Sequence, residues 1–173
     1  MEVNTPLYII GIKDKEAKQG EIVKKHIAIE VLLNIIFGQS SDLYKKLYNE
    51  GEIYSSPMLE YEFAKGYAHI IITGQAKDPE KVYEQFKKAV RNFKEKGIDE
   101  KDFLRIRKMI YGSYIKEYDG PQDIARMFLA DYFKGINSFD YLEEIESVNL
   151  DYIRQVLEDV FNEDKMILSV IKN

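Results

Sequence analysis

The sequence contains no cysteine and no tryptophan, and only two of its 173 residues are histidine. Without thiols the chain can form neither a disulfide nor a thiolate metal site. The two histidines, His26 and His69, are far apart in sequence, and the zinc motif His-x-x-Glu-His is absent. A catalytic zinc centre usually needs three protein ligands. The sequence therefore predicts that this chain alone does not hydrolyse peptides by a zinc mechanism.

Long apolar runs and an excess of positive charge are also missing. The longest apolar stretch, residues 27–37, is interrupted by Glu30 and Asn34, and a bilayer span needs about 20 residues. The N-terminus MEVNTPLYIIG lacks the basic and apolar regions of a signal peptide. The net charge of −5 argues against extensive contact with phosphates. We therefore expect a cytoplasmic protein with no membrane or nucleic-acid partner.

The residues that are present indicate one soluble domain rich in aromatic rings. The composition is 45% apolar and 32% charged, with 13 Tyr and 9 Phe. A chain of this size buries roughly 70% of its unfolded surface, which is enough for a good core. No linker, repeat or low-complexity tract is visible, so residues 1–173 are interpreted as a single domain.

Hydrophobic periodicity and turn residues predict the element order β-α-α-β-β-α-α-α-α-α-β. The fold class is α+β: a mostly antiparallel four-stranded sheet with helices packed on one face. The first and last strands are the most apolar and are expected near the sheet centre. Gly38 is expected to end the first helix in a left-handed conformation. The strands are predicted at residues 7–13, 53–64, 67–75 and 165–171, and the helices begin near residues 19–21, 42, 79, 100, 121, 138 and 149.

One run of residues resembles a known family. Gly-x-Ser-Ser-x-Leu-Tyr-x-x-Leu, followed by Gly-x-x-Tyr-Ser, resembles the second half of the insulinase/pitrilysin-type zinc peptidases, which include the mitochondrial processing peptidases. The element order on both sides agrees with that family, so the resemblance covers nearly the whole chain. The matching residues are Gly38, Ser40, Ser41, Leu43, Tyr44, Leu47, Gly51, Tyr54 and Ser55.

The resemblance implies that this chain is the C-terminal, non-zinc half of a longer two-half peptidase. Zinc is then expected in the missing N-terminal half of the same protein or in a homologous subunit, and no cofactor is expected in this chain. In the family the two halves close around an unfolded peptide. The implied role is to complete the peptide-binding chamber of a zinc metalloendopeptidase without being catalytic alone.

The resemblance also suggests substrate-binding residues. The family's second half contributes an Arg and, a few residues later, a Tyr that reach the substrate and the zinc centre. Tyr54 matches this Tyr, and a phenol can donate a hydrogen bond to a developing oxyanion. The Arg position falls at Tyr48 or Asn49, and neither is Arg. Either the parent is non-catalytic or specialised, or it holds substrate differently; alternatively, Tyr54 simply packs on the sheet.

Two further groups of residues have competing interpretations. Tyr67 and His69 share one face of their strand and could line the peptide chamber, or belong to a solvated sheet face. Together with Tyr54 and Tyr48, they complete the predicted substrate-binding set; no catalytic residue or metal ligand is assigned. His26 and Glu30 lie one helical turn apart and could share a metal, but the simpler interpretation is a polar stripe at the exposed edge of a buried helix.

Two other functions remain open from the sequence. The chain could be a non-catalytic interaction module that forms a homo-oligomer through its polar and aromatic sheet face. An aromatic sheet could also stack RNA bases, but the acidic charge disfavours this.

Overall fold

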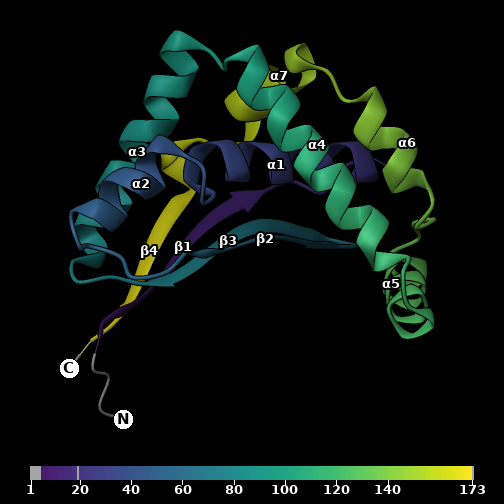
Figure 1. The fold of residues 1–173 in the computed structure, drawn as a ribbon, viewed down its shortest axis with the longest axis horizontal. Helices are drawn as coiled ribbons and strands as arrows, with labels where there is room; N and C mark the ends of the chain where they lie inside the picture. Colours follow the sequence, from purple (N-terminus) through teal and green to yellow (C-terminus); the bar gives the residue numbers. More distant parts are fainter. Residues whose placement is uncertain (1–4, 19, 173) are drawn as a thin grey trace.

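The computed structural model describes residues 5–18 and 20–172, which form a sheet layer and a helix layer (Figure 1). Four strands make one antiparallel sheet in the order β2-β3-β1-β4. The helices cover one face of this sheet, and the other face is open (Figure 1). The predicted element order and fold class are confirmed. The elements are β1 (Leu7–Asp14), α1 (Ile22–Phe37), α2 (Asp42–Asn49), β2 (Met58–Ala64), β3 (Tyr67–Gln75), α3 (Pro79–Lys96), α4 (Glu100–Glu117), α5 (Pro121–Phe133), α6 (Asp140–Ser147), α7 (Leu150–Val160), the 3-10 turn η1 (Glu163–Lys165) and β4 (Met166–Ile171).

Helix α1 is the centre of the hydrophobic core. Ten of its sixteen residues are buried, and it packs against β2 and against α4, α6 and α7. A helix that is apolar on nearly all sides removes its side chains from water only when other elements enclose it, as the sequence predicted. None of the helices in residues 5–18 and 20–172 is long and apolar enough to cross a membrane.

Side chains along the strands alternate between the two faces of the sheet, as the strand sequences predict. On β3, Ala68, Ile70 and Ile72 point to the helix layer and are buried. The intervening residues, including His69, point to the open face. The buried Tyr8 pairs with Gly74 on the same side, and a Cβ on Gly74 would come within 2.6 Å of the Tyr8 hydroxyl oxygen. Gly74 therefore makes room for the Tyr8 ring.

Two predictions about the strands are wrong. β1 does lie inside the sheet, but β4 lies at an edge, where Ile167 of its open face is 69% exposed. Apolar residues on both faces of a strand usually indicate a position in the centre of a sheet. In β4, however, the apolar residues of the open face are not covered by any other part of the described chain. The strand expected to start at Ile53 begins at Met58, because Pro57 cannot donate a ladder hydrogen bond. Ile53 makes only an isolated bridge to Ala76.

The predicted helix starts are mostly confirmed by side-chain caps. The Ser41 hydroxyl accepts a hydrogen bond from the Tyr44 N–H, and Asp78, Asp99 and Asn149 cap α3, α4 and α7 in the same way. Ser138 does not cap α6, which begins at Asp140 without a side-chain cap.

Gly38 ends α1 for a different reason from the one predicted. Its φ and ψ angles are −66° and 166°, which is extended rather than left-handed backbone. A Cβ at this position would lie 2.5 Å from the Asn34 carbonyl oxygen and 2.9 Å from the Asn34 Cα. The chain therefore needs glycine because the backbone turns back tightly over the last turn of α1.

A Gly38→Ala variant is expected to lose about 2 kcal/mol of unfolding free energy, because rigid backbone atoms must move to admit the methyl group. Gly112→Ala is the matched control. Gly112 lies in α4 with no atom within 4 Å of a Cβ, so this change should stabilise the chain by about 0.5–1 kcal/mol. Urea unfolding of the three proteins measures both effects. Equal stability of Gly38→Ala and the unaltered chain would contradict the steric argument.

Candidate functional site

His26 and Glu30 lie one turn apart on α1 and face two tyrosines from other helices. The His26 Nδ1 atom is 2.9 Å from the hydroxyl oxygen of Tyr141 on α6. The Tyr114 hydroxyl on α4 donates to Glu30 Oε2 over 3.4 Å. The two tyrosine rings stack with centroids 5.0 Å apart. We call His26 and Glu30, together with the two tyrosines that they contact, the tyrosine-bridged pair. A cavity of about 500 Å³ adjoins it, lined also by acidic residues of α4 and α5: Glu117, Asp123 and Asp131.

Burial shifts the pKa values of His26 and Glu30 in the directions that favour their neutral forms. It lowers the pKa of His26 to about 4, and the Lys134 cation acts in the same direction. Burial also raises the pKa of Glu30 to about 7, an effect that the Tyr114 hydrogen bond opposes and the Glu117 carboxylate reinforces. At neutral pH the His26 imidazole is therefore uncharged, and Glu30 holds a proton more readily than an exposed carboxyl does.

The tyrosine-bridged pair does not have the composition of a zinc centre. His26 Nδ1 is engaged with Tyr141, and its ring packs at 5.3 Å, centroid to centroid, from Phe63. In the part of the chain that the structure describes, no group of three or more His, Cys, Asp or Glu side chains could hold a metal ion. The interpretation of His26 and Glu30 as structural residues, and not as metal ligands, is thus favoured. Their side chains lie among aromatic rings, however, and not at an exposed helix edge.

The four predicted substrate-binding residues fall into two separate places. Tyr48 lies in the last turn of α2 and stacks on Tyr44, and Tyr54 follows the bridge at Ile53; both residues are more than half exposed. Tyr67 and His69 lie on the open face of β3, with ring centroids 5.8 Å apart. The bridge of Ile53 to Ala76 lies beyond the far end of β3, roughly 20–30 Å from Tyr67 and His69 at about 3.3 Å per residue. The structure therefore does not bring the four side chains into one site, and their role in binding substrate stays a prediction.

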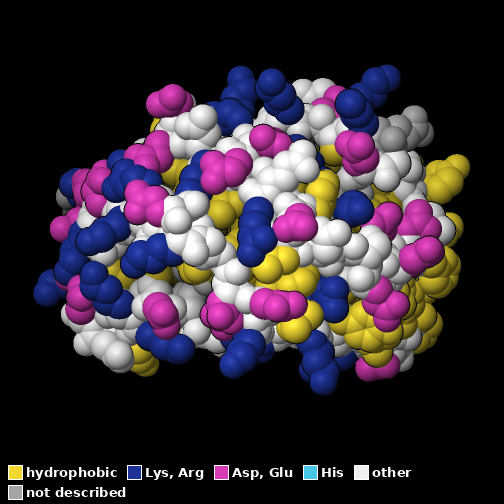
Figure 2. Space-filling view, turned by 90° about the horizontal axis from the view of Figure 1, so that it is seen from above, with side chains coloured by type: hydrophobic (Ala, Val, Ile, Leu, Met, Phe, Trp, Pro, Cys, Tyr) yellow, Lys and Arg dark blue, Asp and Glu magenta, His cyan; other side chains and the backbone are white. Residues whose placement is uncertain are grey.

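The structure also has an apolar surface that the sequence reasoning missed. Four side chains of α5 are at positions i, i+1, i+4 and i+5, hence on one side of the helix, and all are exposed; Phe133 is the most exposed of them at 79%. The hydrophobic side chains gathered at the right-hand end of Figure 2 lie at the end of the molecule where α5 and α6 are found. The sequence did contain a signal for this surface, because the apolar residues of α5 cover more of the helix circumference than one buried stripe requires. We call these residues the α5 patch: Phe128, Leu129, Tyr132 and Phe133.

An exposed apolar cluster on a helix at the edge of the domain is typical of a protein–protein contact. Helix α5 contributes only one buried residue, Asp131, to the described chain, so its apolar side chains are not part of the core. The described residues therefore form a helix–sheet domain without a three-ligand metal group, a His/Glu/Tyr cluster beside a cavity, and an apolar helix face that they leave uncovered.

Comparisons with known proteins place this geometry in a family. The family described as Peptidase M16 inactive domain matches residues 17–110. The uncharacterized zinc protease YmfH of Bacillus subtilis is 27% identical over 168 residues, which are 96% of this chain and 39% of the relative. The chain thus spans about two fifths of the length of that protein.

Solved structures show the same fold. An M16-like peptidase from Alicyclobacillus acidocaldarius matches with a TM-score of 0.92 and 22% identity, over 99% of this chain and 41% of the other. The inactive peptidase domain of a Bordetella parapertussis zinc protease matches with a TM-score of 0.81 and 13% identity, over 97% and 92%. These findings confirm the resemblance that the Gly38–Ser55 segment indicated. Because the family match covers more than half of the sequence, the chain belongs to the Peptidase M16 inactive domain family.

Proposed function

We propose that this chain is the zinc-free half of a two-half M16-type peptidase and completes a peptide chamber beside a zinc centre held by another half. The family is described as an inactive peptidase domain, and this agrees with the missing His-x-x-Glu-His motif. The chain spans only 39% and 41% of the Bacillus and Alicyclobacillus relatives. Their additional length is sufficient for a second domain of similar size.

The observation that carries the proposal is the α5 patch. Large apolar side chains on one helix face are costly in water, and burying them against a partner recovers the hydrophobic free energy. The partner we propose for this surface is the zinc-bearing half, in the same polypeptide or as a homologous subunit. A self-association module remains the alternative hypothesis, because Ile167 and other apolar residues of the open sheet face are also exposed.

Peptidase assays test the proposed function directly. This chain alone should not cleave an unstructured peptide, whereas the same chain with the zinc-bearing half should cleave it in a chelator-sensitive way. A zinc-dependent activity of the isolated chain would refute the proposal. A complex of the two halves that forms but never cleaves peptide would support pairing and refute the peptidase role.

A Phe133→Asp variant should weaken association with the zinc-bearing half tenfold or more, because it places a charge at the most exposed apolar residue of the α5 patch. Met109→Asp is the matched control, since Met109 is exposed on α4 outside the patch. Titration calorimetry with the zinc-bearing half measures both affinities. The same loss in both variants would mean that the contact is not made through the α5 patch.

A further inference from the structure

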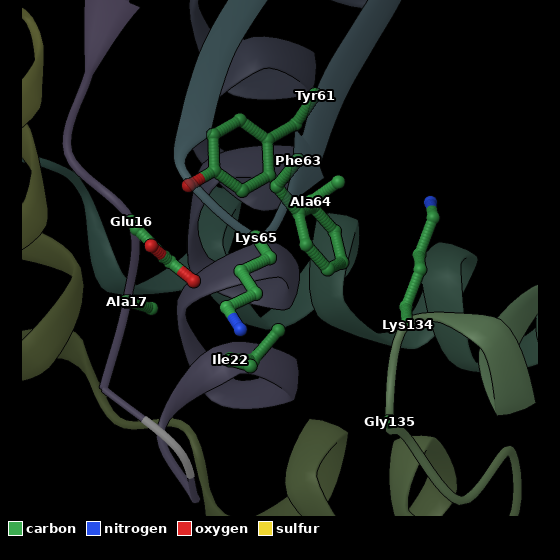
Figure 3. A pocket seen from close by; sticks show the side chains of 9 residues that line it. All are labelled: Glu16, Ala17, Ile22, Tyr61, Phe63, Ala64, Lys65, Lys134 and Gly135. Atoms are coloured by element: carbon green, nitrogen blue, oxygen red, sulfur yellow. The ribbon is translucent and has the colours of Figure 1, made fainter.

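A second cavity opens at the hairpin end of the sheet, between segments that are far apart in sequence (Figure 3). Its volume is about 340 Å³, and its apolar wall consists of Tyr61 and Phe63 from β2 and Ile22 from α1. Both aromatic rings are almost fully buried, so they form a rigid wall. The volume lies near the lower end of the range for ligand sites, about 300–1,000 Å³, and suits one or two amino-acid residues better than a long segment.

The charges around this pocket do not balance. Glu16 accepts a hydrogen bond from the Gly66 N–H over 2.9 Å, so one of its oxygens is used to hold the hairpin. Lys134 places its Nζ atom 4.6 Å from the Phe63 ring centroid, and Figure 3 displays Lys65 and Lys134 on opposite sides of that ring. Within residues 5–18 and 20–172 neither lysine makes an ion pair. The pocket therefore combines an aromatic wall with two ammonium groups and only one carboxylate.

The acidic group next to Tyr61 is already neutralised. Asp14 forms an ion pair with Lys25 over 2.7 Å and accepts the Tyr61 hydroxyl proton in a hydrogen bond of 2.7 Å. Tyr61 is therefore fixed in position, and the Asp14 charge does not offset the two lysines of the pocket. An anion that enters the pocket would meet two ammonium groups and one carboxylate among the lining residues; Asp131, which interacts with Lys134, lies outside the lining.

We propose that this pocket binds peptides through a carboxylate next to an apolar side chain. The apolar side chain packs against Phe63, Tyr61 and Ile22, while the carboxylate is attracted to the ammonium groups of Lys65 and Lys134, one on each side of the Phe63 ring. The carboxylate is either the C-terminus of the peptide or an acidic side chain, since both offer the same chemistry to an ammonium group.

The position of the pocket connects it to the peptide chamber, so its role in selecting substrate rests on the proposed function. Phe133 of the α5 patch immediately precedes Lys134, which places the pocket beside the surface assigned to the zinc-bearing half. Ligand sites occur preferentially at such domain borders. The pocket is then suited to hold one end of a peptide while the remainder extends toward the other half.

Fluorescence anisotropy with three labelled peptides tests the binding chemistry on this chain alone. The first ends in Phe with a free carboxylate, the second is its C-terminal amide, and the third is an amide in which Glu follows the Phe. We expect the second peptide to bind at least tenfold more weakly than the better of the other two. Preference for the first identifies a peptide end, and preference for the third identifies an acidic side chain. Equal binding of all three, or no binding, would overturn the inference.

Charge-removing variants show whether the pocket is the site. Lys134→Met and Lys65→Met keep an unbranched, flexible side chain and should each weaken binding of the preferred peptide tenfold, whereas Lys134→Arg should retain it. Lys108→Met, on the exposed side of α4, is the control. Unchanged binding in both pocket variants would overturn the assignment. Because this assay contains no zinc-bearing half, its failure is distinguishable from a failure of the peptidase proposal.

Discussion

A Tyr54→Phe variant of the two-half protein is expected to cleave peptides with a kcat about a hundredfold lower. Under the proposed function, the Tyr54 hydroxyl would reach the substrate held by the zinc-bearing half and would donate a hydrogen bond to its developing oxyanion. Removal of one such donor typically costs a factor of about 100–1,000 in kcat. Because the hydrogen bond strengthens only as charge develops, KM should change little.

The structure makes this variant a clean test. Tyr54 is 59% exposed and lies in the segment between the bridge at Ile53 and the start of β2, outside the core. Loss of its hydroxyl should therefore leave stability within about 0.5 kcal/mol of the parent. Tyr83→Phe on α3 is the control, because it removes a hydroxyl from a tyrosine that contacts Lys87 instead. If Tyr54→Phe retains full kcat, Tyr54 has no part in transition-state stabilisation.

The second large effect concerns the pH dependence of stability. Glu30 has its pKa raised from 4.5 to about 7, so its contribution to stability is fully present below pH 4.5 and is lost as the pH rises through 7. His26 has its pKa lowered from 6.5 to about 4, so its contribution is present above pH 6.5 and is lost as the pH falls through 4. Between about pH 4.5 and 6.5 the two slopes have opposite signs and largely cancel.

Single substitutions should reveal how Glu30 and His26 each change the stability of the chain with pH. Relative to the unaltered chain, Glu30→Gln should gain about 3 kcal/mol of unfolding free energy as the pH rises from 4.5 to 7, because the cost of ionising a buried carboxyl is gone. His26→Gln should gain a similar amount, relative to the unaltered chain, as the pH falls from 6.5 to 4. Urea titrations at several pH values measure both differences. Parallel profiles for all three proteins would mean that the tyrosine-bridged pair does not carry these pKa shifts.

Local sequence signals predicted the elements because their causes are local. The caps at Asp78 and Asp99 and the hairpin bend at Gly66 depend on residues within three or four positions. Gly38 is an instructive exception: glycine at a helix end suggests a left-handed residue, but contact with Asn34 requires it here. The signal was correct about where the helix ends and wrong about the cause.

The arrangement of the site could not be predicted in the same way. Periodicity placed His26 and Glu30 on one side of α1, but their partners Tyr141 and Tyr114 are on α6 and α4. Which helix packs there is decided by the whole core and leaves no local pattern. The edge position of β4 has the same origin, since strand order depends on how the whole sheet assembles and not on the residues of one strand.

The pairing of β4 with β1 has a consequence for how the chain acquires its structure during synthesis. Leu7 lies opposite Ile171, so β1 pairs with a strand that is synthesised more than 150 residues later. Strands β1, β2 and β3 can assemble with α1 while translation continues, but β1 keeps a free edge until β4 emerges. Such a late, long-range closure is slow. A nascent chain that stalls in the helices before β4 would expose the backbone groups of β1 and should depend on chaperones.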